Sequence, residues 1–319
     1  PGITEALESL VSDATIGNPE NPLCWTTKSL RNLQKELESQ GHRISHVKIG
    51  ELLAQMGYSL QLNQKALQVG EAHVDRDAQF TYINAKARCF MEDGQPVISV
   101  DTKKKENVGN FKNNGAEYAP AGSPPEVLDH DFPILGLGKA SPYGIYDVRE
   151  NEGYVSVGIS SDTAAFAANS IRTWWDEMGC LKYHGASRLY ITADGGGSNG
   201  SRNKLWKKEL QQLSNETGLE IHVSHFPPGT SKWNKIEHRM FSHISKNWRG
   251  RPLVSLAVII SLIGSTTTKK GLKVQCGLDT NEYETGIKVP EGELNELNIS
   301  RDEFHGEWNY WVSPSETFA

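Results

Sequence analysis

The sequence Arg188-Leu-Tyr-Ile-Thr-Ala-Asp194, followed at once by Gly195-Gly-Gly-Ser-Asn-Gly200, indicates the fold class of this 319-residue chain. A short run of apolar and β-branched residues that ends at a glycine-rich segment is typical of a buried strand that stops at a loop. Asp194 is therefore predicted to lie at the carboxyl end of a strand. Residues 202–212 then predict a helix and 220–226 a second strand. This alternation of strands and helices favours an α/β fold.

Two further acidic residues occupy comparable positions. The sequence Pro96-Val-Ile-Ser-Val-Asp101 predicts another buried strand that ends in an aspartate. Glu237 follows a loop, 227–234, and lies near the start of a predicted helix in which apolar residues recur at helical spacing. Such carboxylates can hold two divalent cations, because Mg²⁺ prefers hard oxygen ligands and keeps several waters. Two metal ions about 3.5–4 Å apart can activate the attacking oxygen of a phosphodiester cleavage and stabilise the leaving one.

The motifs around the three acids resemble those of a known family. They read Val-Ile-Ser-Val-Asp101-Thr-Lys-Lys-Lys-Glu, Ile-Thr-Ala-Asp194-Gly-Gly-Gly-Ser-Asn-Gly and Phe-Pro-Pro-Gly-Thr-Ser-Lys-Trp-Asn-Lys-Ile-Glu237-His-Arg-Met-Phe. Together they are similar to the acidic triad of bacterial insertion-sequence DDE transposases, of the Rhodopirellula-type family related to the mariner-like group. The resemblance extends from about Leu23 to just before Trp311. Because the chain starts at Pro1 without a methionine, we expect a fragment that lacks part of the DNA-end-binding region.

The resemblance implies an RNase H-like catalytic domain with a mixed five-stranded sheet and flanking helices. It also implies a metal-dependent DNA transposase, in which Asp101 bridges two Mg²⁺ ions (Mn²⁺ can substitute) and Asp194 and Glu237 each help to hold one. Hydrolysis at the element's end would free a 3′-hydroxyl, which then attacks a phosphodiester of target DNA. The implied partners are double-stranded terminal-repeat and target DNA and a second copy of the chain in a homodimer.

Other interpretations stay open at this point. A strand-terminal Asp often serves as a turn former or helix cap, although three acids in three long motifs argue against that for the set. The rival enzyme is an RNase H-like nuclease that cleaves DNA without strand transfer. The rival from another class is a non-catalytic, DNA-binding transposase remnant.

The first part of the chain predicts a small helical domain. Residues 4–60 read as helical, with Thr27 as the cap of a helix carrying Leu30, Leu33 and Leu37, and Ser45 as the cap of the next. Two short capped helices joined by a turn predict a helix-turn-helix, whose second helix would enter the DNA groove. The predicted organisation is a DNA-binding region, a linker, a catalytic domain and a C-terminal extension packed on it, at 1–61, 62–74, 75–270 and 271–319.

Basic and polar residues near these motifs are the candidates for DNA contact. The net charge of −6 does not by itself suggest a nucleic-acid partner, but lysines and arginines surround the second and third acids, and local field counts for more than the total. These cations could also be simply solvated helix faces. The candidates are Arg43, His46, Lys48, Lys103, Asn199, Arg202, Lys232, Lys235 and Arg239.

Cysteine spacing and hydropathy exclude other classes. The four cysteines lie far apart without CxxC spacing, so a zinc site is not expected and a reduced cytoplasmic protein is the default. The resemblance implies a bacterial protein associated with the nucleoid. The longest apolar run, 253–264, is shorter than the roughly 20 residues that a membrane span needs. It predicts a buried helix that packs behind the helix of Glu237.

Overall fold

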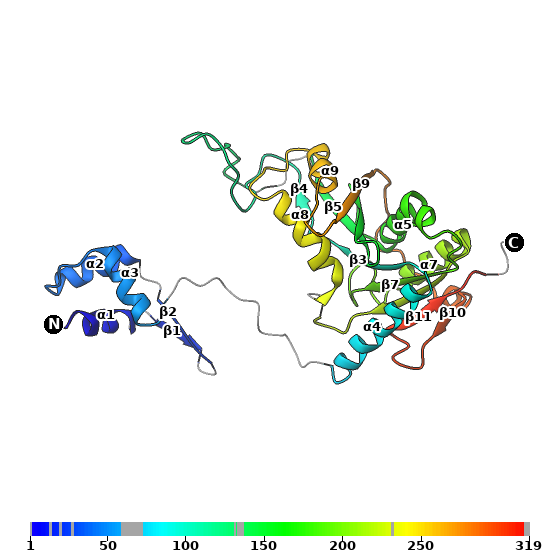
Figure 1. Cartoon of the computed structure of the whole chain (residues 1–319), viewed down its shortest axis with the longest axis horizontal. Helices are drawn as coiled ribbons and strands as arrows, with labels where there is room; N and C mark the ends of the chain where they lie inside the picture. Colours follow the sequence, from blue (N-terminus) through cyan, green and yellow to red (C-terminus); the bar gives the residue numbers. More distant parts are fainter. Residues whose placement is uncertain are drawn as a thin grey trace. The chain divides into compact units, whose positions relative to one another are not determined.

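The computed structural model describes residues 2–12, 15–18, 21–26, 29–58, 73–130, 132, 137–230 and 233–315. The chain divides into two compact units, 1–67 and 68–319 (Figure 1). Lys232 and most of the predicted linker, 62–72, lie outside the described residues.

The first unit holds three helices and one hairpin. Helices α1 (Ile3–Ser12), α2 (Leu30–Ser39) and α3 (His46–Gln55) bury one cluster of leucine, isoleucine and valine side chains. Ser45 caps α3 as predicted, whereas the cap of α2 is Ser29 rather than Thr27. The all-helical prediction is wrong between α1 and α2, where β1 (Thr15–Asn18) and β2 (Asn21–Thr26) pair antiparallel. Glycine, asparagine and two prolines at 17–22 disfavour a helix there.

A nine-stranded mixed sheet forms the centre of the second unit. Its order is β10-β11-β8-β7-β3-β5-β6-β9, with β4 paired to β5. Strands β3, β7 and β8 run parallel, β5 is antiparallel to β3 and β6, β9 is parallel to β6, and β11 is antiparallel to β8. The strands are β3 (Val97–Thr102), β4 (Glu106–Asn107), β5 (Lys139–Asp147), β6 (Glu152–Gly158), β7 (Arg188–Ala193), β8 (Glu220–His225), β9 (Lys273–Asp279), β10 (Ile299–Arg301) and β11 (Asn309–Val312).

The sheet is larger than the five strands expected from the sequence. The five central strands, β6-β5-β3-β7-β8, are consistent with the expected RNase H-like arrangement, but the segment after residue 271 adds β9 at one edge and β11 and β10 at the other. Two of these added strands have only three or four residues. They pair with each other, and β11 joins the sheet by pairing with β8, which lies far away in the sequence, so local pattern does not reveal this edge.

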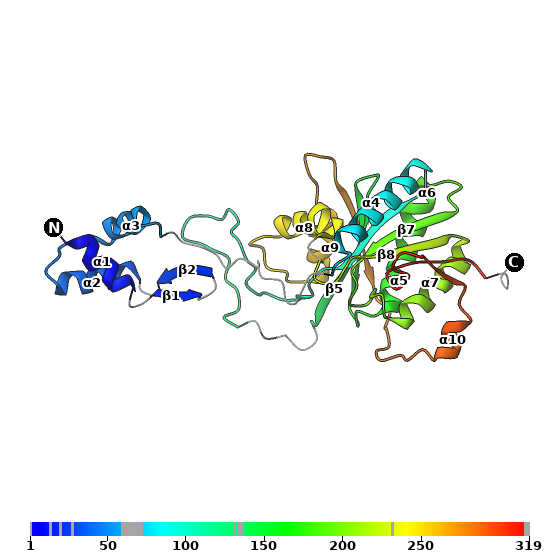
Figure 2. The same ribbon diagram turned by 90° about the horizontal axis from the view of Figure 1, so that it is seen from below.

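Helices cover both faces of the sheet (Figure 2). On one face α5 (Ala164–Trp174) and α7 (Lys204–Thr217) pack over the main core cluster. On the other face lie α4 (Arg76–Glu92), α8 (Ser242–Asn247) and α9 (Leu256–Gly264). The apolar run thus forms the predicted helix behind Glu237. The remaining helical segments are η1 (Trp175–Gly179), α6 (Cys180–Lys182), η3 (Glu237–Phe241) and α10 (Glu291–Asn295).

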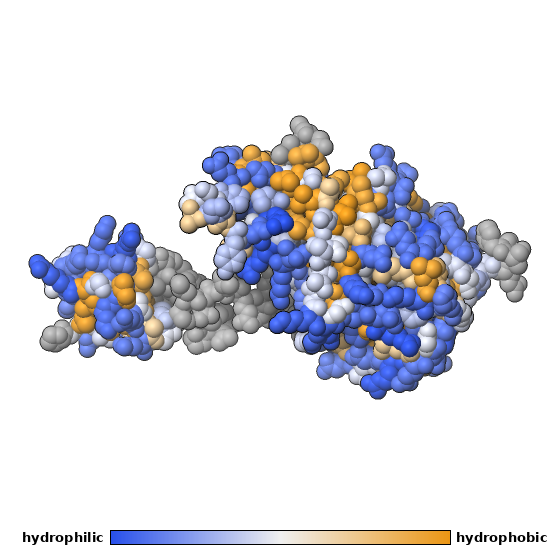
Figure 3. All heavy atoms as spheres, turned by 45° about the horizontal axis from the view of Figure 1, so that its top comes forward, coloured by the Kyte–Doolittle hydropathy of each residue, from blue (hydrophilic) through white to orange (hydrophobic). Residues whose placement is uncertain are grey.

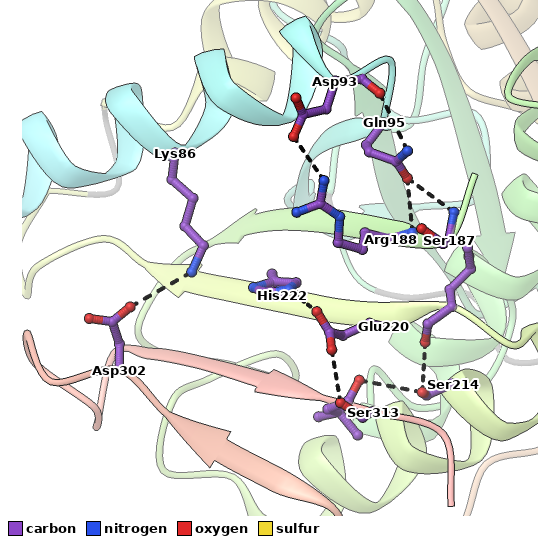
Figure 4. Close-up of polar contacts among 12 residues, drawn as sticks. Lys86, Asp93, Gln95, Ser187, Arg188, Ser214, Glu220, His222, Asp302 and Ser313 are labelled. Carbon is purple, nitrogen blue, oxygen red and sulfur yellow. Dashed lines mark hydrogen bonds and ion pairs between the residues drawn. The ribbon is translucent and has the colours of Figure 1, made fainter. Parts of the chain in front are cut away.

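A set of paired polar groups fixes the amino ends of β7 and β8 (Figure 4). The Arg188 guanidinium lies 2.8 Å from the Asp93 carboxylate, and the Gln95 side-chain oxygen accepts hydrogen bonds from two backbone N–H groups, at 187 and 188. On β8, Glu220 contacts the His222 ring at 2.6 Å. At this end of the sheet, Arg188 is therefore paired with an opposite charge, and Glu220 and Gln95 have hydrogen-bond partners.

The visible surface is mostly hydrophilic, with an apolar band near α9 (Figure 3). Exposed apolar side chains of this region include Val254 before α9 and Leu278 on β9. Within the described parts of the chain, no helix has both the length and the hydrophobicity that crossing a membrane requires.

Candidate active site

The three predicted acids come together at one edge of the sheet. Asp101 lies on β3, and Asp194 follows β7 directly. Val100 pairs with Ala193 across these parallel strands, so the two aspartates occupy neighbouring positions at the carboxyl ends. Glu237 is the first residue of η3, a π-helical turn that continues into α8.

A buried asparagine anchors the loop that delivers Glu237. The Asn234 side-chain nitrogen donates to the Val100 carbonyl and to the Asp194 carboxylate, both at 3.1 Å. The Ser99 hydroxyl contacts the Asn234 side-chain oxygen and accepts a hydrogen bond from the backbone N–H of Ile236 at 3.1 Å. This clamp ties the loop before η3 to β3, and it holds the third acid beside the other two.

Burial and mutual repulsion raise the pKa values of the acids. Burial is the largest cause for Asp101, whose pKa rises to about 8 with added repulsion from Asp194 and Glu237. Burial also raises the pKa of Asp194 to about 6, against the hydrogen bond from Asn234, and it raises that of Glu237. Like-charged carboxylates in a partly desolvated site favour uptake of a cation or of protons.

Asp101 and Asp194 line a cleft of about 580 Å³. Its wall includes a fourth acid, Asp162, which adds to the repulsion on Asp101 and accepts a hydrogen bond from the Thr102 hydroxyl at 3.2 Å. The cap of α5 is the next residue, Thr163. The cleft is lined by Asp101, Thr102, Asp162, Asp194, Gly195, Gly196, Gly197, Ser198, Asn199, Ser201, Arg202, Phe226, Pro227, Pro228, Gly229 and Trp308.

The glycine-rich loop after Asp194 forms one wall of this cleft. Its winding needs glycine, because Gly197 has φ +74° and a Cβ at Gly200 would lie 3.1 Å from the Gly195 carbonyl oxygen. Two side chains of the loop are buried, and the Ser198 hydroxyl and the Asn199 side-chain nitrogen have no hydrogen-bond partner among the described residues. Unpartnered buried polar atoms in a cleft wall are suited to a polar ligand.

A series of side-chain hydrogen bonds supports the backbone of Asp194. The Asp194 carbonyl accepts from His225 Nδ1 at 3.0 Å, so His225 Nε2 accepts from the Tyr310 hydroxyl at 3.2 Å. That hydroxyl in turn accepts from Trp206 Nε1 at 3.0 Å. Burial lowers the pKa of His225 to about 4, which keeps the ring neutral. No local sequence pattern indicates these hydrogen bonds, since their side chains lie on β8, β11 and α7.

Comparison with known proteins identifies the family. A family model described as the Rhodopirellula transposase DDE domain matches residues 6–314. The chain belongs to this DDE transposase family. The solved structures similar to it include a Mos1 transposase paired-end complex with the left transposon end, with 13% identity, 80% of this chain and 68% of that chain covered and a TM-score of 0.41. A Mos1 mariner paired-end complex with Mn has 14% identity, the same coverage and a TM-score of 0.42. No curated protein matches the chain.

The basic candidates of this DDE transposase occupy different settings. Exposed Arg202 lines the cleft beside the buried Asn199. Partly buried Lys235 has its pKa lowered by burial and by the charge of exposed Arg239, so these two cations lie near each other, as predicted. Lys103 is largely buried, 4.5 Å over the Trp248 ring, and its charge acts on Glu237. The structure thus places Lys103 among the active-site groups rather than on an open surface.

The candidates of the first unit lie on its surface. Arg43 precedes α3, and His46 and Lys48 are in its first turn, all exposed. The Lys48 ammonium contacts the Glu51 carboxylate at 2.6 Å. These positions agree with outward-facing residues of a second helix.

Proposed function

We propose that the chain is the cleaving and joining enzyme of a transposable element. It would cut DNA at the element's ends and transfer the freed 3′-hydroxyl into target DNA. The observation that supports this most is the gathering of three acids from three separate elements, in a chain of the DDE transposase family. Asp101 and Asp194 line one cleft, and the charge of Glu237 acts on both of them. The RNase H-like topology is part of the same proposal.

The donor set fits divalent cations. The three carboxylates offer only oxygen ligands, and their raised pKa values reflect a crowded negative site that a cation would relieve. We propose that Asp101, Asp194 and Glu237 would together hold two Mg²⁺ ions, with Mn²⁺ as a substitute. Bound there, two such ions supply activation of the attacking oxygen and stabilisation of the leaving oxygen.

Neighbouring side chains would orient the DNA backbone. Asn199 and Arg202 line the cleft, where the Arg202 guanidinium would donate hydrogen bonds to a phosphate oxygen, and the unpartnered Asn199 side-chain nitrogen is buried in the cleft wall. Lys235 and Arg239 form a second basic pair beside Glu237. The buried Lys103 ammonium would balance the charge on Glu237. Phosphate contacts of this kind position the duplex without reading its sequence.

The first unit would recognise the element's ends. The turn between α2 and α3 carries the exposed Arg43, and the first turn of α3 carries the exposed His46 and Lys48, an arrangement that supports a helix-turn-helix role. We propose the organisation 1–61 for DNA recognition, 62–74 as linker, and 75–270 with the 271–319 extension for catalysis. Deletion of residues 1–61 should then weaken binding of terminal-repeat DNA and leave the rest folded, as measured by DNA binding and thermal unfolding.

A cleavage and joining assay tests the proposed function. The purified chain is given a labelled terminal-repeat duplex and a target duplex, with and without Mg²⁺. Products in which the labelled end is joined to target DNA, formed only with Mg²⁺, would support the transposase. Cleavage without joining would favour the RNase H-like nuclease, and binding without cleavage would favour a DNA-binding remnant.

A further inference from the structure

A second group of metal-ligating side chains lies outside the acidic triad. His73, Asp75 and His305 each offer one ligand atom, and these three atoms lie within 4.8 Å of one another. Two of the residues immediately precede or cap α4, and His305 lies in the loop between β10 and β11. All three belong to the second unit, so the cluster is formed within one folded body.

His305 is held in an unusual conformation. Its φ is +50°, in the left-handed region that side chains other than glycine rarely adopt. Its Nδ1 lies 2.7 Å from a Glu307 carboxylate oxygen, so Nδ1–H donates and the other ring nitrogen is directed to Asp75 Oδ2 at 3.1 Å. The Trp308 ring stacks on it with centroids 4.4 Å apart. Such strain at a non-glycine residue often marks a functional constraint.

This geometry is the one that metal-binding histidines share. A ligating histidine usually donates its second ring N–H to a carboxylate, which fixes the tautomer and the ring orientation. Glu307 has that place behind His305. The His73 ring packs edge-on against both His305 and Trp308, at centroid distances of 5.4 and 4.8 Å. Two imidazoles and a carboxylate therefore converge from opposite sides of one small volume.

We propose that His73, Asp75 and His305 bind a borderline divalent cation of the Zn²⁺ type. Zn²⁺ accepts nitrogen and oxygen ligands in tetrahedral geometry, so three protein ligands leave one position for water. Imidazole nitrogen suits Zn²⁺ better than Mg²⁺, which prefers oxygen. The site is thus distinct in chemistry from the all-carboxylate triad.

The cluster also has a simpler arrangement without a cation. Asp75 and His305 can form an ion pair, and the Asp75 backbone N–H donates to His73 Nδ1 at 3.2 Å. In this arrangement only the His305 imidazole is a cation, and the His73 imidazole does not contribute to charge balance. The test below separates the two states, because an ion pair does not respond to Zn²⁺.

The bound cation would act as a clamp between α4 and the C-terminal loop. The same helix contacts this loop again through Asp302, which accepts from the Tyr82 hydroxyl at 2.5 Å and lies 3.9 Å from the Lys86 ammonium (Figure 4). The clamped loop leads into β11, whose Tyr310 belongs to the series of hydrogen bonds that supports Asp194. Trp308, in the same loop, lines the cleft. Metal binding would therefore stabilise the support of the active site without touching the reacting atoms.

Zn²⁺ titration of the full-length chain tests the proposal. All measurements use an Asp101→Asn, Asp194→Asn background, so that the acidic triad binds little metal. Zn²⁺ at about a hundred times its Kd should raise the Tm by about 5–10 °C. Co²⁺ in place of Zn²⁺ should give the visible absorption of a nitrogen-ligated, low-coordinate ion.

Variants assign the response to these residues. His73→Ala replaces a residue with an exposed ring, so it should fold normally yet lose both the Tm shift and the Co²⁺ absorption. His305→Ala should lose both as well, whereas His184→Ala, a change at another exposed histidine, should keep them. An unchanged Tm on adding Zn²⁺ to the parent protein would overturn the proposal in favour of the ion pair. Equal Zn²⁺ responses in the parent and in His73→Ala would overturn it too.

Discussion

Charged side chains are arranged in opposite ways at the two ends of the central sheet. At the amino ends of β7 and β8, charged groups are paired and partly exposed, as for Arg188 with Asp93, whose side chains are 34% and 48% accessible. At the carboxyl ends of β3 and β7, Asp101 and Asp194 are partly buried, and the charge of Glu237 on η3 adds to the repulsion at both. The Asn199 side-chain nitrogen beside them has no hydrogen-bond partner among the described residues.

This difference distinguishes polar groups that stabilise the fold from polar groups that bind a ligand. Oppositely charged groups that pair at a surface stabilise the folded chain slightly and need no ligand to balance their charge. Crowded like charges and unpartnered donors destabilise the folded chain, and they persist where a ligand can satisfy them. Substitutions at the two ends should therefore differ in their effects on cleavage and on stability.

The largest effect is expected at the triad. Asp101→Asn, Asp194→Asn and Glu237→Gln should each lower cleavage by about a thousandfold or more, since loss of a ligand charge removes several kcal/mol of metal-assisted stabilisation. DNA binding, measured by gel shift, should stay nearly unchanged. A variant that still cleaves at the parent rate would remove its residue from the site.

Asn234→Ala should come next. Losing the hydrogen bond to Asp194 and the clamp on β3 should lower cleavage by about 10–100-fold, the usual effect of removing a group that orients a metal ligand. Steady-state cleavage should be compared with thermal unfolding of the same preparation. If cleavage falls only in proportion to the folded fraction, the asparagine is a packing residue and no more.

Tyr310→Phe should show mainly in stability. It leaves His225 Nε2 and Trp206 Nε1 buried without a partner, which costs about 1–3 kcal/mol of unfolding free energy. The control is Tyr143→Phe, because the buried Tyr143 hydroxyl has no hydrogen-bond partner among the described residues. Denaturant unfolding measures both variants, and equal losses would contradict the proposed support chain.

Lys235 and Arg239 should influence salt dependence. If both contact DNA phosphates, the double variant Lys235→Ala, Arg239→Ala should reduce the slope of log K against log salt by about 0.9 for each contact. Lys269→Ala, Lys270→Ala, a pair of exposed lysines before β9, is the matched control. A loss confined to terminal-repeat DNA would make the pair readers of sequence instead.

The smallest effect is expected at the paired end. Arg188→Ala should lower the unfolding free energy by at most about 1 kcal/mol, since its ion pair with Asp93 is partly exposed. Cleavage by the folded protein should not change. A drop in cleavage at equal folded fraction would show that the two ends are coupled through β7.

The strand ends and the acids were predictable from sequence because their signals are local. An apolar run that stops at an acid and a glycine-rich loop predicted both Asp101 on β3 and Asp194 after β7. The hairpin β1–β2, the cap at Ser29 and the nine-stranded sheet were missed. Those features depend on competing turn residues or on partners distant in the sequence.

The functional surroundings of the acids were less accessible to sequence reasoning. Asp162 reaches the cleft because Thr163, and not Asp162, caps α5. His225 is tied to Tyr310, 85 positions further along the chain. Lys103, a candidate for DNA contact, is largely buried over Trp248. Each outcome is decided by tertiary packing.

The place of Tyr310 has a consequence for the order of events during synthesis. The residues of the acidic triad are complete once Glu237 has been translated, but the hydroxyl behind Asp194 comes about 70 residues later. At about 5–20 residues per second, that interval lasts roughly 4–15 s. A nascent chain on the ribosome therefore carries all three acids for some seconds before it can hold the second one in place. Premature stop codons in this interval would yield products with an intact triad and little ability to cut DNA.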